Sequence, residues 1–278
     1  MLRNQGQLKA ARRLYERALA ICERVLGPDH PQTASSLNHF GILLADQGEM
    51  VAARRIHERA LNVRERVLGH DHPHTAHSLN NLGFALRALG EVDEARRLHQ
   101  RALDIRQRVL GPDHPDTAYS LINLGIVLHA QGKLTAARQV LEGALSICEQ
   151  ALGPHHPRTA RSLNYLALLL QTQSELSAAG NLHERALAIR QRALGGDHPD
   201  TATSLYNIAF LHLAQGDPAA ARPLFERTLA VRERVLGPDH PDTVATRRAL
   251  AELAAEGGRA AAGDSPHNAI RQDDGGTQ

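Results

Sequence analysis

The sequence contains very few aromatic residues: tryptophan is absent, and four phenylalanines and four tyrosines make up 3% of the 278 residues. Hydrophobic residues nevertheless account for 42% of the chain. The buried interior must therefore consist mainly of leucine, alanine, isoleucine and valine, and these side chains suit closely packed helices.

Long apolar runs and an excess of charge of one sign are also absent. No run of about 18 apolar residues is present, so we expect no segment to span a membrane. The first residues, Met-Leu-Arg-Asn-Gln-Gly, lack the apolar core of a signal peptide, which makes the protein cytoplasmic by default. Lysine and arginine total 32 against 30 aspartates and glutamates, so the net charge favours neither nucleic acid nor a membrane as the partner.

The sequence does contain a strict repeat of 42 residues. Asp-His-Pro occurs at five places and His-His-Pro at a sixth, and no insertion or deletion disturbs the register. Leu-Gly precedes each of these sites and a threonine follows it; the sites begin at residues 29, 71, 113, 155, 197 and 239. Such self-similarity is typical of a solenoid, in which each unit buries its apolar face only against its neighbours.

Each repeat has the periodicity of two helices. Apolar residues recur every three or four positions through 73–88 and again through 91–110. The Leu-Gly pair ends the second helix, because glycine readily adopts the left-handed conformation that terminates helices. Pro73 suits the first turn of a helix, and Asp71 or His72 lies where a side chain caps it. The histidine of each motif is therefore predicted to be structural.

These patterns predict an all-α protein, an alpha-alpha superhelix of antiparallel helix pairs. We divide the chain into a partial repeat at 1–30, five full repeats, a capping helix at 241–255 and a disordered tail at 256–278. The full repeats are 31–72, 73–114, 115–156, 157–198 and 199–240. The tail is assigned from its glycine, aspartate, alanine and glutamine content.

The two ends of the array differ in polarity. Residues 1–26 correspond to the end of a first helix and all of a second helix, so half of a repeat is missing. Leu14, Leu19 and Ile21 are then expected to be exposed and to permit self-association. At the other end, Arg247 replaces the buried leucine of the full repeats, which predicts a polar cap.

No pattern in the sequence predicts catalysis, a cofactor or a metal site. Cys22 and Cys148 occupy the same position three repeats apart, which is about 30 Å at roughly 10 Å per repeat, so we expect free thiols. The six motif histidines are one repeat apart, too far to share a metal ion. The alternative is a stray nickel or zinc ion at the densest histidine cluster, which consists of His70, His72, His74 and His77. Phosphate-binding loops, His-Glu-x-x-His, Gly-x-Ser-x-Gly and Cys-x-x-Cys are absent.

The helical pattern resembles the tetratricopeptide repeat (TPR), whose usual unit is about 34 residues. The segment Leu79-Asn-Asn-Leu-Gly-Phe-Ala-Leu86, the turn at Gly90, and Ala95 and Ala102 have its spacing. The 42-residue form, with LGPDHPDTA and SLNNLG, closely resembles the repeats of kinesin light chains and of bacterial tandem arrays. The resemblance covers about residues 1–255 and implies a TPR solenoid whose first helices line a concave groove.

The resemblance also implies that ligand contacts lie on the first helix of each repeat. The predicted groove residues are Asn38, Asn80, Asn164, His77, Tyr119, Arg161, Tyr206, Phe84, Arg87 and Phe210. An asparagine amide can hold an extended peptide backbone because it both donates and accepts hydrogen bonds. Kinesin light chains combine such asparagines with basic side chains to hold acidic peptides. Here Ile122 and Tyr206 depart from the asparagine row, and only Arg87 and Arg161 are clearly basic.

Two functions remain open on the sequence. The first is a non-catalytic scaffold that binds a protein or an extended peptide in the concave groove. The alternative is a sensor or regulatory segment of a larger signalling protein, whose NB-ARC-type ATPase or protease domain is absent from this chain. Nucleic-acid binding ranks third: Arg64, Arg66, Arg106 and Arg108 stripe the second helices, but interleaved glutamates and the small net charge argue against it.

Overall fold

The structure, a computed structural model, describes residues 8–261, and over this range the chain forms twelve α-helices and no strand. The helices are α1 (Leu8–Leu26), α2 (Pro31–Asp46), α3 (Met50–Leu68), α4 (Pro73–Ala88), α5 (Val92–Leu110), α6 (Pro115–Ala130), α7 (Leu134–Leu152), α8 (Pro157–Thr172), α9 (Leu176–Leu194), α10 (Pro199–Ala214), α11 (Pro218–Leu236) and α12 (Pro241–Ala261). The all-α prediction is confirmed. The helix predicted at 73–88 is α4, and the helix predicted at 91–110 begins one residue later as α5.

The histidine-proline motif starts every even-numbered helix in the same way. The Nδ1 atom of His72 accepts a hydrogen bond from the backbone N–H of His74 at 3.1 Å, and the other five motif histidines make the same bond. Of the two predicted candidates, His72 rather than Asp71 caps the helix. Pro73 occupies the first turn, where its lack of an N–H costs nothing.

The Leu-Gly pair ends the odd-numbered helices as predicted. Gly69 has φ +91°, a left-handed conformation that disfavours larger residues. Thr75, the threonine that follows the motif, donates its hydroxyl to the carbonyl of Gly69 at 2.8 Å. One local motif therefore ends a helix, turns the chain and starts the next helix.

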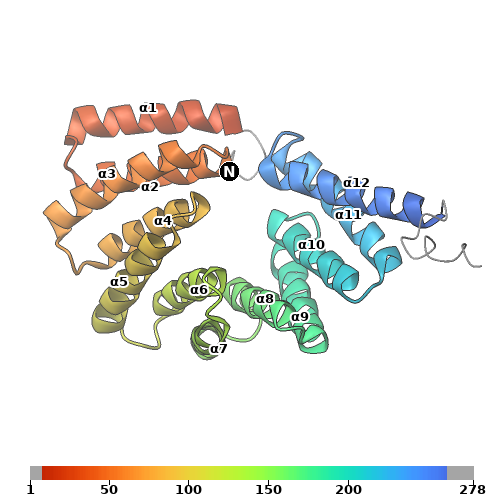
Figure 1. Ribbon diagram of the computed structural model, residues 1–278. Helices are drawn as coiled ribbons and strands as arrows, with labels where there is room; N and C mark the ends of the chain where they lie inside the picture. Colours follow the sequence, from red (N-terminus) through yellow and green to blue (C-terminus); the bar gives the residue numbers. More distant parts are fainter. Residues whose placement is uncertain (1–7, 262–278) are drawn as a thin grey trace, which may run out of the picture.

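Helix pairs follow one another around an arc, as Figure 1 shows, and in the middle of the arc α4, α6, α8 and α10 lie on the inside and α5, α7 and α9 on the outside. Successive even-numbered helices from α2 to α10 contact one another, and we call the face that they line the inner surface. The arc brings its two ends together, because a Cβ placed on Gly48 would lie only 3.8 Å from Cγ of Pro241. The curved solenoid predicted from the repeats is thus observed, in nearly one full turn.

Small residues let the two helices of a repeat approach closely. A Cβ built on Gly41 would come within 2.5 Å of the ring of His57, and one on Gly83 within 2.7 Å of His99. In the next repeat the side chain of Leu141 fills the equivalent space above Gly125. A glycine at these positions allows a large buried side chain on the partner helix.

The ends of the array depart in part from the prediction. Leu14 and Ile21 are exposed on α1 as expected, but Leu19 is only 8% exposed because it packs against α2. The helix α12 extends beyond the predicted end at 255, so the first residues of the predicted tail are helical. The remainder of the tail, 262–278, lies outside the described residues.

Candidate functional site

The predicted groove asparagines do not face an open surface. Asn38 and Asn80 are each 1% exposed, so the expectation that they project into the groove is wrong. Asn164 is 4% exposed, but it does line a cavity that is described below. The Nδ2 of Asn38 donates to Oγ of Ser78 in the next repeat at 2.8 Å, and its Oδ1 lies 3.2 Å from Nδ1 of His57. These amides hold successive repeats together, because the position after the buried leucine points into the interface between repeats.

A second correction concerns Arg64 and Arg106 of the outer helices, which are only 3% and 4% exposed. Their counterparts Arg190 and Arg232 are buried in the same way, at 6% and 4%. The Nη1 of Arg64 donates to the carbonyl of His74 at 2.7 Å and to Oγ of Ser78 at 3.0 Å. Burial lowers the pKa of Arg64 to about 10. These guanidinium groups join an outer helix to the first turn of the next inner helix, so they are unsuited to contact nucleic acid.

One repeat replaces this polar set with apolar side chains. In the α6–α7 repeat, Ile122 stands in the asparagine position, Leu141 in the histidine position and Cys148 in the arginine position. All three are at most 2% exposed, and they belong to the hydrophobic cluster in the middle of the helical array. Both cysteines are free thiols, as predicted.

A cavity of about 440 Å³ opens on the inner surface beside this apolar repeat, between α6 and α8. Its lining is Ile126, His129, Leu141, Tyr165, Leu168, Gln171 and Thr172. The apolar side chains suit an aliphatic or aromatic group, and His129, Gln171 and Thr172 add hydrogen-bonding groups to the lining.

A second cavity of about 350 Å³ lies on the other side of α8, towards α10. It is lined by Arg158, Arg161, Arg190, Asp200, Asn164, Thr203, Pro157 and Tyr165. Tyr165 contributes to both cavities, so an apolar recess and a cationic recess share one wall.

Arg161 is the arginine in this second cavity that is best placed for a ligand. Its guanidinium lies over the ring of Tyr119 at 4.7 Å and near that of Tyr165 at 5.8 Å. In contrast, Arg158 pairs with Asp116 at 3.0 Å, and Arg190 donates to backbone and hydroxyl oxygens. Among the described residues, Arg161 makes no ion pair within 4.0 Å, although Tyr119 and Asp200, which also lines this cavity, interact with its charge. Its guanidinium is therefore without a carboxylate in direct contact.

The other predicted groove residues are distributed along the inner helices. Phe84 and Phe210 are 44% and 41% exposed, and His77 and Tyr206 are half-buried. Arg87 lies 5.6 Å from the ring of Phe84, and Tyr206 packs edge-on against Phe210 at 4.8 Å. These residues form two groups with aromatic side chains, one on each side of the two cavities along the inner helices.

Tyr165 and Arg158 were not predicted. Tyr165 occupies the position that holds asparagine in three other repeats, at 81, 123 and 207. That departure from the repeat pattern is the signal that could have identified it. Arg158 carries no comparable signal, since the residue after the motif proline varies from repeat to repeat.

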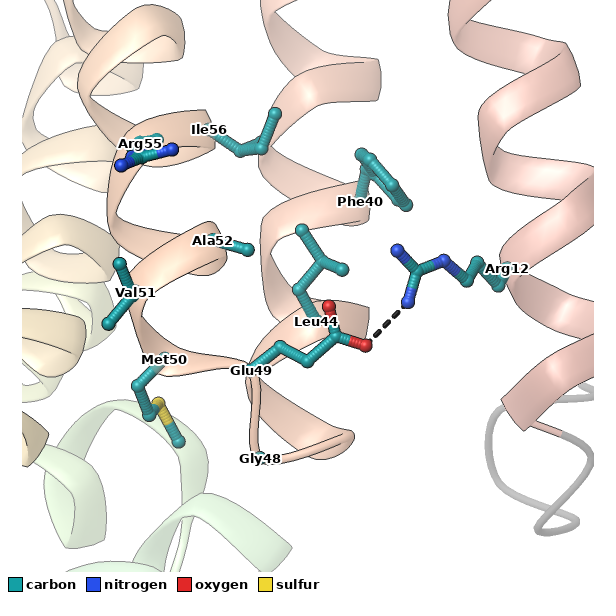
Figure 2. A pocket seen from close by; sticks show the side chains of 10 residues that line it. All are labelled: Arg12, Phe40, Leu44, Gly48, Glu49, Met50, Val51, Ala52, Arg55 and Ile56. Carbon is teal, nitrogen blue, oxygen red and sulfur yellow. Dashed lines mark hydrogen bonds and ion pairs between the residues drawn. The ribbon is translucent and has the colours of Figure 1, made fainter.

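A third cavity lies away from the inner surface. Figure 2 shows this space of about 560 Å³ between α1 and α3, over Phe40 and Leu44 of α2. An ion pair of 2.5 Å between Arg12 and Glu49 crosses one side of it. It was not predicted, and two of its charged lining residues, Arg12 and Glu49, pair with each other.

The side chains of the histidine cluster at His70, His72, His74 and His77 make contacts with nearby residues. The rings of His72 and His74 lie 5.1 Å apart, and Nδ1 of His72 is occupied by the helix cap. Burial, together with Arg64 and Arg106, lowers the pKa of His77 to about 4. Within residues 8–261 no three histidine, cysteine, aspartate or glutamate side chains are grouped to hold a metal ion. None of the helices described there is long and apolar enough to cross a membrane.

Comparisons with known proteins agree with this architecture. The tetratricopeptide repeat family model matches residues 1–50, 36–91, 78–149, 123–191, 164–233 and 205–262. No curated protein sequence matches the chain.

Solved structures of similar fold include the nearly identical TPR-like repeats of a kinesin light chain from Podosopora anserina, at 26% identity and a TM-score of 0.56. That match covers 73% of this chain and 97% of the other. A second similar structure is BtubC (BKLC) from P. vanneervenii, at 23% identity and a TM-score of 0.60. This match covers 81% of this chain and 89% of BtubC, and it supports the fold alone. The chain is a member of the tetratricopeptide repeat family, with repeats like those of kinesin light chains.

Proposed function

We propose that this protein is a non-catalytic scaffold that binds an extended segment of a partner protein along the inner surface. The observation that carries the proposal is the pair of cavities on either side of α8, one apolar and one containing the unpaired Arg161. A peptide that places an apolar side chain in the first and a carboxylate or another hydrogen-bond acceptor in the second would satisfy both. Tyr119, Tyr206, Phe84, Arg87, Phe210 and His77 extend this contact surface along the arc.

The buried asparagines have a different role in this proposal. They fix the spacing of successive repeats, and so they set the distance between the groups that contact the ligand. Most ligand contacts come from residues in the neighbouring positions of the same helices, and Asn164 also lines the second cavity.

The outer surface supports a protein ligand over nucleic acid. Arg66 and Arg108 pair with Asp29 and Asp71 of the preceding repeat. An arginine that already has a carboxylate partner contributes little to binding phosphates. An inner-surface site for protein is therefore favoured over an outer-surface site for DNA or RNA.

The test begins with a random peptide library displayed on phage and selected on the immobilised full-length chain. The tightest peptide is then titrated against Arg161→Gln and Leu168→Asp, one variant for each cavity. Both variants should bind at least about tenfold more weakly, because each removes one of the two contacts. Val109→Asp, on α5 and 48% exposed, should bind like the wild-type chain. Peptides that bind both cavity variants with unchanged affinity would place the site elsewhere.

A further inference from the structure

The helix α1 carries a face that is bare here but covered in every full repeat. Ile21 is 44% exposed, whereas its counterparts Val63 and Ile105 are 4% and 1% exposed. Ala18 is exposed, whereas Ala60 and Ala102 are fully buried. In the full repeats an inner helix of the same repeat covers these positions. We therefore expect an inner helix to pack on the exposed face of α1.

The helix α12 is the one inner helix described here without an outer helix of its own. Its side towards α11 is buried through Thr243, Thr246, Ala249 and Leu253. The side where its own outer helix would lie, through Val244, Arg247, Ala251 and Ala254, is exposed. The contact near Gly48 involves Pro241, at the start of α12, and leaves this side free.

Charged residues at the two ends are also complementary. Arg17 corresponds to Arg59, Arg101 and Arg185, which pair at 2.5–2.6 Å with a glutamate of the preceding repeat. Glu233 at the C-terminal end stands in the position of those glutamates. It now accepts a bond from Arg247 at 2.7 Å, and its carboxylate can accept a second donor.

A second pair follows the same register. Arg24 corresponds to Arg66, Arg108 and Arg234, which pair with an aspartate of the preceding repeat. Asp239 is exposed in the position of those aspartates. Both arginines of α1 therefore lack the carboxylates that a preceding repeat supplies, and the C-terminal end carries those carboxylates.

We propose that two copies of this chain associate head to tail, with α12 of one copy covering α1 of the next. The interface completes a helix pair and adds Arg17–Glu233 and Arg24–Asp239 contacts between copies. Because the two surfaces differ, the contact is heterologous and leaves one free end on each side, so the assembly can grow beyond two copies.

Association through two α1 helices is the main alternative, and the charges oppose it. Arg13, Arg17 and Arg24 flank the apolar face, and none of them forms an ion pair among the described residues. Two such helices would bring arginines against arginines, whereas α12 brings Glu233 and Asp239.

Arg247 limits the strength of the proposed contact. It occupies the position of Leu37, Leu79 and Leu163, each fully buried in its repeat. Docking of α1 would cover part of this charge, so Arg247→Leu should tighten the association. The same substitution would leave an α1–α1 contact unchanged, because Arg247 is at the other end of the array.

Sedimentation velocity over a wide range of protein concentration tests the proposal on the full chain. The wild-type mass should rise with concentration past that of two copies, and Arg247→Leu should associate at least about tenfold more tightly. Ile21→Glu blocks only the α1 face and Ala251→Glu only the α12 face. Each alone should remain a monomer, and a mixture of the two should form one-to-one dimers. Both residues are exposed, and unchanged helical circular dichroism confirms that the variants are folded.

Arg17→Glu should weaken association at least tenfold, whereas the matched change Arg13→Glu should have little effect. The counterparts of Arg13 make no ion pair with a preceding repeat among the described residues. The proposal is overturned if wild-type and Arg247→Leu chains are both monomers at every concentration. It is also overturned if Ala251→Glu still dimerises while Ile21→Glu does not, since that result identifies an α1–α1 contact.

Discussion

The imidazole of His99 lies directly against the backbone of Gly83, so that a Cβ on Gly83 would approach Cε1 of His99 to 2.7 Å. On its other side the ring is fixed by Asn80, whose Oδ1 lies 2.8 Å from Nδ1 of His99. One buried ring thus joins the two helices of its repeat, and Asn80 passes the connection to Ser120 in the next repeat at 2.9 Å.

Gly83→Ala should destabilise the protein even though alanine is the better helix former. The added methyl group displaces a buried ring, and overpacking of this kind costs about 1–3 kcal/mol. Urea unfolding followed by circular dichroism measures the loss. Gly143→Ala is the matched control: it is also helical, its Cβ would meet nothing within 4 Å, and it should stabilise by up to about 1 kcal/mol.

Asn80→Ala should lower the free energy of unfolding by about 1–3 kcal/mol, because Nδ1 of the buried His99 loses its partner and Ser120 keeps only its bond from Arg106. An asparagine that faced an open groove would instead give a neutral or stabilising change. Asn62→Ala, at an exposed position of α3, supplies the comparison. Equal effects of the two substitutions would contradict the buried role of Asn80.

Arg106→Ala should be far more destabilising than Arg108→Ala, two residues along the same helix. Arg106 is 4% exposed and donates to Asp116 and Ser120, whereas Arg108 pairs with Asp71 at the surface. Loss of the buried guanidinium leaves polar groups without partners and should cost about 2–4 kcal/mol, against less than about 1 kcal/mol for the surface pair. Thermal melts of the two variants under identical conditions decide the order.

Stability should fall as the pH is lowered from 7 to 5. Burial lowers the pKa of His57 and His183 to about 4 and that of His99 to about 3. Below the ordinary histidine pKa of about 6.5, the unfolded chain binds protons that the folded chain cannot, at roughly 1.4 kcal/mol per pH unit for each histidine. The free energy of unfolding should keep falling until the pH reaches the pKa values of these histidines in the folded protein. Above pH 7 the histidines are neutral in both states, and this effect disappears.

The chain itself suggests the control for this pH dependence. The double change Asn80→Ile with His99→Leu copies the pair Ile122 and Leu141, which occupies the same two positions in the α6–α7 repeat. Melting temperatures of this variant should depend less steeply on pH, since one titrating ring is gone. An unchanged slope would mean that His99 does not contribute.

The repeat sequence predicted the fold because its signals are local. Leu-Gly and His-Pro act within a few residues, and the threonine, the cap and the proline each satisfy a neighbouring backbone group. The 42-residue register then fixes the order of the helices without any long-range information. The bounds of α4 could be predicted for this reason.

The candidate site was only partly predictable, because it depends on how neighbouring repeats pack. Periodicity places Asn38 and Asn80 on the side of the helix next to the groove, but the rotation between repeats decides whether they reach the ligand or the next helix. The joint replacement of asparagine, histidine and arginine by Ile122, Leu141 and Cys148 in one repeat was visible in the sequence. Three positions that change together indicate mutual contact, and that signal pointed to burial.

Gly48 and Pro241 lie close together although several repeats separate them along the chain. The distance between them therefore depends on the rotation between every pair of successive repeats. A small rotation at each interface barely changes the distance between neighbouring helices, yet all the rotations add at these two residues. Spectroscopic labels at positions 48 and 241 would therefore report the curvature of the entire inner surface. A ligand that tightens or flattens the arc would be detected there even if it bound at the opposite side of the molecule.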